Sequence, residues 1–97
     1  MQRAHYATKA VIGDASRLKI GVVVSQFNND ITDSMLAGAL ATLQAWKVAK
    51  RNITVVHVPG SFEIPLGCVM ALRKKKIDAL VALGCVLKGE TKHDEYI

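Results

Sequence analysis

The stretch KIGVVV, residues 19–24, decides the fold class of this chain. Its apolar and largely β-branched residues occupy consecutive positions rather than alternate ones. Such a run is typical of a strand that is buried on both faces, as in a parallel sheet with helices on either side. We therefore expect a parallel β-strand here.

The residues that follow alternate between helical and strand patterns. A helix is predicted from Ile31 to Val48, with one apolar stripe at spacings of three or four residues; its members are Ile31, Met35, Ala39, Leu43 and Trp46. Asn29 or Asp30 is expected to cap the start of this helix. A strand is predicted over 53–58, a helix capped by Ser61 over 61–74, and a third strand over 79–86.

This order of strand, helix, strand, helix and strand predicts an α/β domain with a parallel sheet. Residues 1–17 are polar and mixed, and we expect an N-terminal arm there, followed by a single domain over 18–97. An open sheet of three strands leaves long unprotected edges. We therefore expect the domain to be truncated on its C-terminal side.

The composition is that of a globular protein. The 97 residues are 51% hydrophobic and 22% charged, with a formal net charge of +5, which excludes disordered, collagen-like, coiled-coil and disulfide-scaffold classes. The two cysteines, Cys68 and Cys85, lie in apolar runs, which predicts buried thiols in a reduced, cytoplasmic chain. The longest apolar run, residues 79–87, falls far short of the roughly 20 residues of a membrane helix. We expect no membrane partner and no metal site.

Residues 73–76, Arg-Lys-Lys-Lys, contribute most of the net charge. Nucleic-acid binding is one interpretation. The favoured one is a solvated helix end whose cations offset the helix dipole, because no aromatic residues interleave with the run. We therefore expect no nucleic-acid partner.

Polar and aromatic residues follow each predicted strand, at 25–28, 59–63 and 88–93. In open parallel sheets, ligands bind outside the carboxyl ends of the strands. Phe27 is either a rim residue packed on the core or a stacking surface for a flat ligand. Phe62 permits the same two interpretations, with core packing favoured.

The second and third of these segments carry polar groups suited to a ligand. Ser61 is either a plain helix cap or part of an anion site, and Glu63 either binds ligand hydroxyls or complements the helix dipole. The turn 89–91, Gly-Glu-Thr, has amides that can hold a phosphate, although the pattern is common. Histidine side chains ordinarily titrate near neutral pH, so His93 beside this turn is a candidate for proton transfer.

Together the segments SQFN (25–28), VPGSFEIP (58–65) and GCVLKGETKH (84–93) resemble lumazine synthases, the 6,7-dimethyl-8-ribityllumazine synthase family of riboflavin biosynthesis. The resemblance runs from about Leu18 to residue 97. It implies a three-layer αβα sandwich with a parallel, flavodoxin-like sheet. It also implies a transferase that condenses 5-amino-6-(D-ribitylamino)uracil with L-3,4-dihydroxy-2-butanone 4-phosphate, releases phosphate and water, and needs neither a metal nor an organic cofactor.

The resemblance also implies a role for each matching residue. Phe27 corresponds to the aromatic that stacks on the pyrimidine, and His93 to the proton donor. Ser61, Phe62 and Glu63 correspond to the segment that binds the ribityl chain and the uracil. Cys85, Val86 and Leu87 correspond to a strand end whose backbone binds the uracil. Glu90 and Thr91 correspond to a turn whose amides bind the phosphate. The family's sites form between subunits of a pentamer, which in some members assembles into a larger shell.

Two features depart from the family pattern. Asp94 stands where the family usually has an aromatic residue after its histidine, and the family's phosphate-clamping arginine lies beyond residue 97. Two other functions stay open at this point. One is a module that binds a flavin-like ligand without chemistry, and the other is a shell-forming structural protein.

Overall fold

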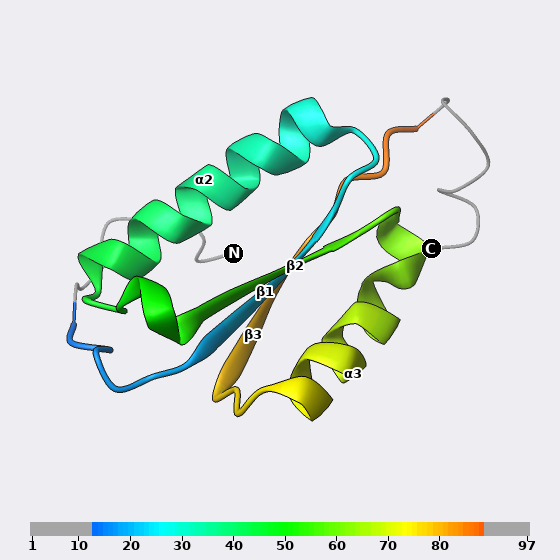
Figure 1. Ribbon diagram of the computed structural model, residues 1–97. Coiled ribbons are helices and arrows are strands. Elements are labelled where there is room, and N and C mark those ends of the chain that lie inside the picture. Colours follow the sequence, from blue (N-terminus) through cyan, green and yellow to red (C-terminus); the bar gives the residue numbers. More distant parts are fainter. Residues whose placement is uncertain (1–12, 89–97) are drawn as a thin grey trace, which may run out of the picture.

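The computed structural model describes residues 13–88, which form a three-stranded parallel sheet with one helix on each face (Figure 1). The strands are β1 (Ile20–Ser25), β2 (Ile53–Val58) and β3 (Ala79–Leu83), and the helices are α2 (Asn29–Ala45) and α3 (Ile64–Lys74). Short 3-10 turns, η1 (Lys50–Asn52) and η2 (Ser61–Glu63), precede β2 and α3. The predicted α/β class and three-layer arrangement are confirmed.

The strand order is β2-β1-β3, with β1 in the centre and both pairs parallel. The chain passes from β1 to β2 on one side and then returns past β1 to β3. Right-handed crossovers in opposite directions place the two connecting helices on opposite faces of the sheet, as Figure 1 shows for α2 and α3. This is the beginning of a flavodoxin-like order, in which the direction reverses between β1 and β3.

Strand β1 is buried along its whole length, as the KIGVVV run predicts. Ile20 and Val22 belong to a core under α2, together with Val48 and the partly buried Leu36 and Leu43. On the other face, α3 lies close to the sheet at a glycine. A β-carbon built on Gly67 would come within 2.9 Å of the Val23 side chain and 2.8 Å of the Val58 side chain. A small residue is therefore needed where α3 crosses β1 and β2.

Helix α2 begins earlier and ends earlier than its apolar pattern predicts. Its N-cap is Asn28, in the left-handed region at φ 61° and ψ 46°, so the predicted caps Asn29 and Asp30 lie inside the first turn. At the other end Lys47 has φ 72°, and the Lys47 and Val48 amides donate to the carbonyls of Gln44 and Leu43. This is a Schellman ending, and it leaves Trp46 outside the helix and exposed.

Two other expectations need correction. Cys68 and Cys85 are free thiols, as expected, but each is only partly buried. The third strand ends at Leu83 rather than Val86, because its last partner on β1 is Val24 and the chain of β1 turns away soon after. Within residues 13–88, no helix is long and apolar enough to cross a bilayer.

Candidate active site

The carboxyl ends of the three strands meet at one edge of the sheet, and hydrogen bonds join the segments that follow them. The Gln26 and Phe27 amides donate to the carbonyls of Val58 and Pro59, at 2.8 and 2.9 Å. These bonds extend the contact between the two segments beyond the end of β1. They place Phe27 directly beside the segment that leads into α3.

A third contact joins the segment after β1 to the segment after β3. The side-chain amide of Asn28 donates a hydrogen bond of 3.2 Å to the carbonyl oxygen of Cys85. The two segments flank the point where the strand order reverses, and open α/β sheets bind ligands at that point. Asn28 belongs to the strand-end segment 25–28, but sequence reasoning assigned it no role of its own, because its contact with Cys85 depends on the strand order.

The loop after β3 also lies against the start of η2. A β-carbon built on Gly84 would come within 2.7 Å of the Ile64 side chain and 3.0 Å of the Ser61 hydroxyl, with the Ser25 hydroxyl at 3.7 Å. Glycine therefore allows the three segments to approach each other closely. Ser25 Oγ is buried and has no hydrogen-bond partner within residues 13–88, although a buried hydroxyl usually finds one.

The turn at Gly60 to Glu63 is held by two reciprocal hydrogen bonds. The Gly60 amide donates to the Glu63 carboxylate at 2.8 Å, and the Glu63 amide donates to the Gly60 carbonyl at 3.1 Å. Gly60 rather than Ser61 is therefore the cap of this segment, and the plain-cap interpretation of Ser61 is wrong. One carboxylate oxygen of Glu63 is committed to the backbone, which fixes the side chain beside the site.

The aromatic residues of the site are accessible. Phe27 is 44% exposed and Phe62 is 49% exposed. The favoured interpretation of Phe62 as a core residue is therefore wrong. Half-exposed rings at a ligand edge can present one face to a flat ligand. Beyond β3, Cys85 and Val86 are partly buried and Leu87 is exposed, all without regular secondary structure.

The rest of the predicted site lies outside the described residues. These positions are Glu90, Thr91, His93 and Asp94. Within residues 13–88, no three His, Cys, Asp or Glu side chains form a group that could hold a metal ion. The structure thus brings together Phe27, Ser61, Phe62, Glu63 and the segment 84–87.

The fold and this edge define an α/β protein of the open parallel type, with a candidate ligand site where three strand-end loops converge. Residues 17–97 match the sequence model of the 6,7-dimethyl-8-ribityllumazine synthase family. The chain belongs to that family, and the resemblance of its three loop motifs is confirmed.

Two relatives show how much of such a protein the chain represents. Over 86 residues it is 41% identical to the 6,7-dimethyl-8-ribityllumazine synthase of Phocaeicola vulgatus and 43% identical to that of Parabacteroides distasonis. In both alignments 89% of this chain is covered, but only 51% and 54% of the relatives. The chain therefore spans about half the length of these curated relatives.

Proposed function

We propose that the full-length protein is a lumazine-forming transferase of riboflavin biosynthesis. It condenses 5-amino-6-(D-ribitylamino)uracil with L-3,4-dihydroxy-2-butanone 4-phosphate and releases phosphate and water. The observation that carries the proposal is the convergence of the three family motifs at one edge, where Asn28 bonds to Cys85 and Phe27 bonds to Pro59. Family membership supports the choice of reaction.

The pyrimidine substrate is assigned to the edge that residues 13–88 describe. Phe27 stacks on the pyrimidine ring. Backbone groups of Cys85, Val86 and Leu87 form hydrogen bonds with the uracil. Ser61, Phe62 and Glu63 hold the ribityl chain. The ring exposure of Phe27 and the fixed Glu63 carboxylate support these roles, since a stacking face and a positioned acceptor are what a ribityl-pyrimidine requires.

The phosphate-bearing substrate is assigned to the turn at Glu90 and Thr91. Its backbone amides bind the phosphate, and Lys88 next to the turn, with an exposed side chain, adds positive charge. His93 donates and accepts protons as an amine of the pyrimidine attacks the ketone, phosphate leaves, and the second ring closes. Each step moves a proton, so correct positioning and one acid/base group suffice.

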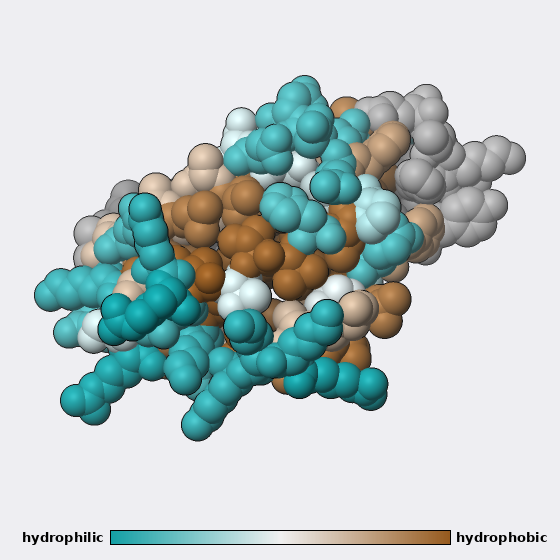
Figure 2. Space-filling model, in the orientation of Figure 1, coloured by the Kyte–Doolittle hydropathy of each residue, from teal (hydrophilic) through white to brown (hydrophobic). Residues whose placement is uncertain are grey.

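The protein is also proposed to associate with copies of itself. Four apolar side chains of α3 are exposed in the chain by itself, namely Leu66, Val69, Met70 and Leu72. Between α3 and β2 lies a shallow apolar groove of about 120 Å³ that Val56, Met70 and Ala71 help to line. Figure 2 shows apolar side chains gathered on this face between the two helices. A second copy would bury this surface, since contiguous exposed apolar side chains mark interaction sites.

A cytoplasmic location is proposed as well. The support is that both cysteines are free thiols, which persist in a reducing compartment.

The activity is tested by following lumazine formation with the full-length protein, the two substrates and no added metal. Phe27→Leu should raise KM for the pyrimidine about fivefold, because a lost stacking contact is worth roughly 1 kcal/mol. Trp46→Leu is the matched control: it removes an aromatic of similar exposure at the far end of α2 and should leave KM unchanged.

Two results would contradict the proposal. One is an absence of lumazine formation by a folded full-length protein that binds riboflavin tightly, which would indicate a flavin-binding module. The other is the same absence in a protein that sediments as a large shell and binds neither substrate, which would indicate a structural role.

A further inference from the structure

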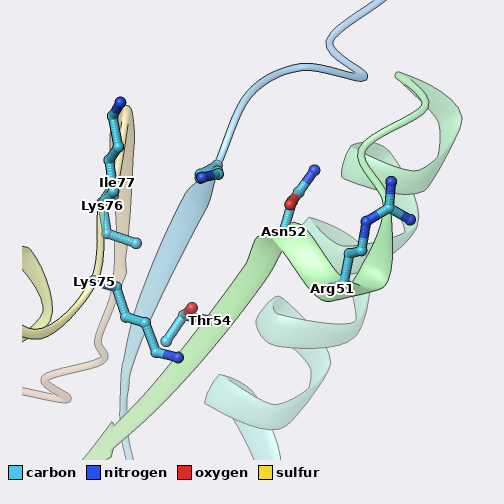
Figure 3. A pocket seen from close by; sticks show the side chains of 7 residues that line it. Arg51, Asn52, Thr54, Lys75, Lys76 and Ile77 are labelled. Atoms are coloured by element: carbon cyan, nitrogen blue, oxygen red, sulfur yellow. The ribbon is translucent and has the colours of Figure 1, made fainter.

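A cavity lies at the opposite edge of the sheet from the candidate active site, where the strands begin. It has a volume of about 270 Å³ and lies between the start of β2, the start of β1 and the segment that links α3 to β3. Figure 3 shows Arg51 and Asn52 on one side, with Thr54 on β2 and Lys75 and Lys76 on the other side. The lining residues are Lys19, Arg51, Asn52, Thr54, Lys75, Lys76 and Ile77.

Four of the seven lining residues are cationic, and none is acidic. Within residues 13–88, no ion pair engages the charged ends of Lys19, Arg51, Lys75 or Lys76. Asp78 is close to Lys19, but its carboxylate accepts a 2.7 Å hydrogen bond from the Lys19 backbone amide, while its own amide donates to the Lys19 carbonyl. The four cations outnumber this one neighbouring carboxylate, so the cavity carries an excess of positive charge, and clefts with such an excess concentrate counter-ions.

The end of α3 explains why two of these cations belong to the cavity. The helix ends at Lys74, and Lys75 is its C-cap in an extended conformation at φ −132° and ψ 152°. Arg73 and Lys74 thus remain in the last helical turn, where cations offset the dipole. Lys75 and Lys76 leave the helix and turn towards the sheet, so the basic run divides into two parts with different environments.

We propose that this cavity binds a multiply charged phosphate anion, of the pyrophosphate or nucleoside triphosphate kind. Arg51 offers a planar fork of N–H donors that matches phosphate oxygens, the lysines add point charges, and the Asn52 amide and Thr54 hydroxyl add neutral donors. At about 270 Å³, the hollow is close to the lower limit of small-ligand sites, roughly 300 Å³. Its distance from the strand-end loops makes this site independent of the proposed activity.

The shape and composition of the cavity favour a small anion over a nucleic acid. No aromatic residue lines it, so it lacks the stacking surface that single strands use. The charges surround one hollow instead of following a groove along the molecule, and Figure 2 shows long hydrophilic side chains gathered at this end. Pyrophosphate and nucleoside triphosphate share the recognised chemistry, and the experiment separates them.

The test is isothermal titration calorimetry of the full-length protein with pyrophosphate and, separately, with adenosine triphosphate. The double variant Arg51→Gln/Lys75→Gln removes two cations of the cavity. The matched control, Lys50→Gln/Arg73→Gln, also removes one lysine and one arginine, and both residues are exposed but do not line the cavity. Circular dichroism establishes that each variant is folded, and Lys75→Gln alone serves as the milder change.

We expect one anion site per chain to weaken at least tenfold in the cavity variant and less than twofold in the control. Equal affinity for the two anions would identify free pyrophosphate-like ions as ligands, and tighter binding of the triphosphate would identify nucleotides. Equal weakening in both double variants, no weakening in either, or no anion binding to the unaltered protein would overturn the proposal. So would an oligonucleotide that binds more tightly than either anion and responds equally to both variants.

Discussion

The side chain of Asn28 and the carbonyl oxygen of Cys85 are joined by a hydrogen bond of 3.2 Å across 57 residues of sequence. The bond links the segment after β1 to the segment after β3. Asn28 is also the N-cap of α2, but its side chain makes no capping bond to that helix. The side-chain N–H of this residue holds the two sides of the candidate site together.

Two substitutions separate the stabilising effect of the Asn28–Cys85 hydrogen bond from the effect of the left-handed conformation of Asn28. Asn28→Gly keeps the left-handed backbone but loses the bond, and we expect the free energy of unfolding to fall by about 1 kcal/mol. Asn28→Ala loses the bond and adds left-handed strain, roughly 1–2 kcal/mol more. Urea denaturation measures both, and KM for the pyrimidine should rise in each variant. Equal stability of the two variants would contradict the role of the left-handed conformation.

Gly67 and Gly38 form a matched pair in the two helices. Gly67→Ala forces a methyl group against the buried side chains of Val23 and Val58, so we expect a loss of roughly 1–3 kcal/mol in the free energy of unfolding. Gly38→Ala meets nothing within 4 Å and should stabilise α2 by about 0.5–1 kcal/mol. Thermal unfolding of both variants gives the comparison. A stabilised Gly67→Ala protein would show that α3 does not lie so close to the sheet.

Lys47 occupies the position after α2 that glycine usually takes. Its φ of 72° lies in the left-handed region, where the conformational energy of a lysine is higher than that of a glycine. Lys47→Gly should therefore raise the free energy of unfolding by about 0.5–1 kcal/mol, as measured by urea denaturation. Lys47→Ala is the control: it removes the same charge without relieving the backbone and should give no gain. A gain in both variants would assign the effect to charge.

His93→Ala tests the acid/base role in the full-length protein. We expect kcat to fall by about 10²–10⁴, the usual contribution of a general acid or base. The dissociation constant of the pyrimidine should change little, since the ring and ribityl contacts are assigned to other residues. Steady-state kinetics and a direct titration separate the two effects. Unchanged turnover would remove His93 from the mechanism.

Leu72→Glu tests the apolar surface of α3. Leu72 is 51% exposed in the chain by itself, and a carboxylate buried against a second copy would be unpaired and costly. Sedimentation velocity should therefore show a smaller species than the unaltered protein forms. Ser34→Glu, an exposed polar position on α2, adds the same charge and should leave the assembly intact. Dissociation by both variants would mean that net charge, and not this surface, controls assembly.

Local patterns predicted the strands well and the ends of α2 poorly. Residues 53–58 are a strand as expected, and the KIGVVV run is a fully buried strand shifted by one residue. The ends of α2 depend on two left-handed residues, Asn28 and Lys47, neither of which is a glycine. The end of β3 depends on where β1 stops offering a partner. No pattern within residues 79–86 contains that information.

The sequence by itself determined the alternation of strands and helices, the buried central strand and the family motifs, because these follow from spacing and residue type along a short segment. Only the tertiary structure decided the strand order, and with it the bond between Asn28 and Cys85 and the gathering of Arg51 with Lys75 at the other edge. These contacts join segments that are distant in sequence. Their formation depends on packing two helices against opposite faces of one sheet, which no local pattern encodes.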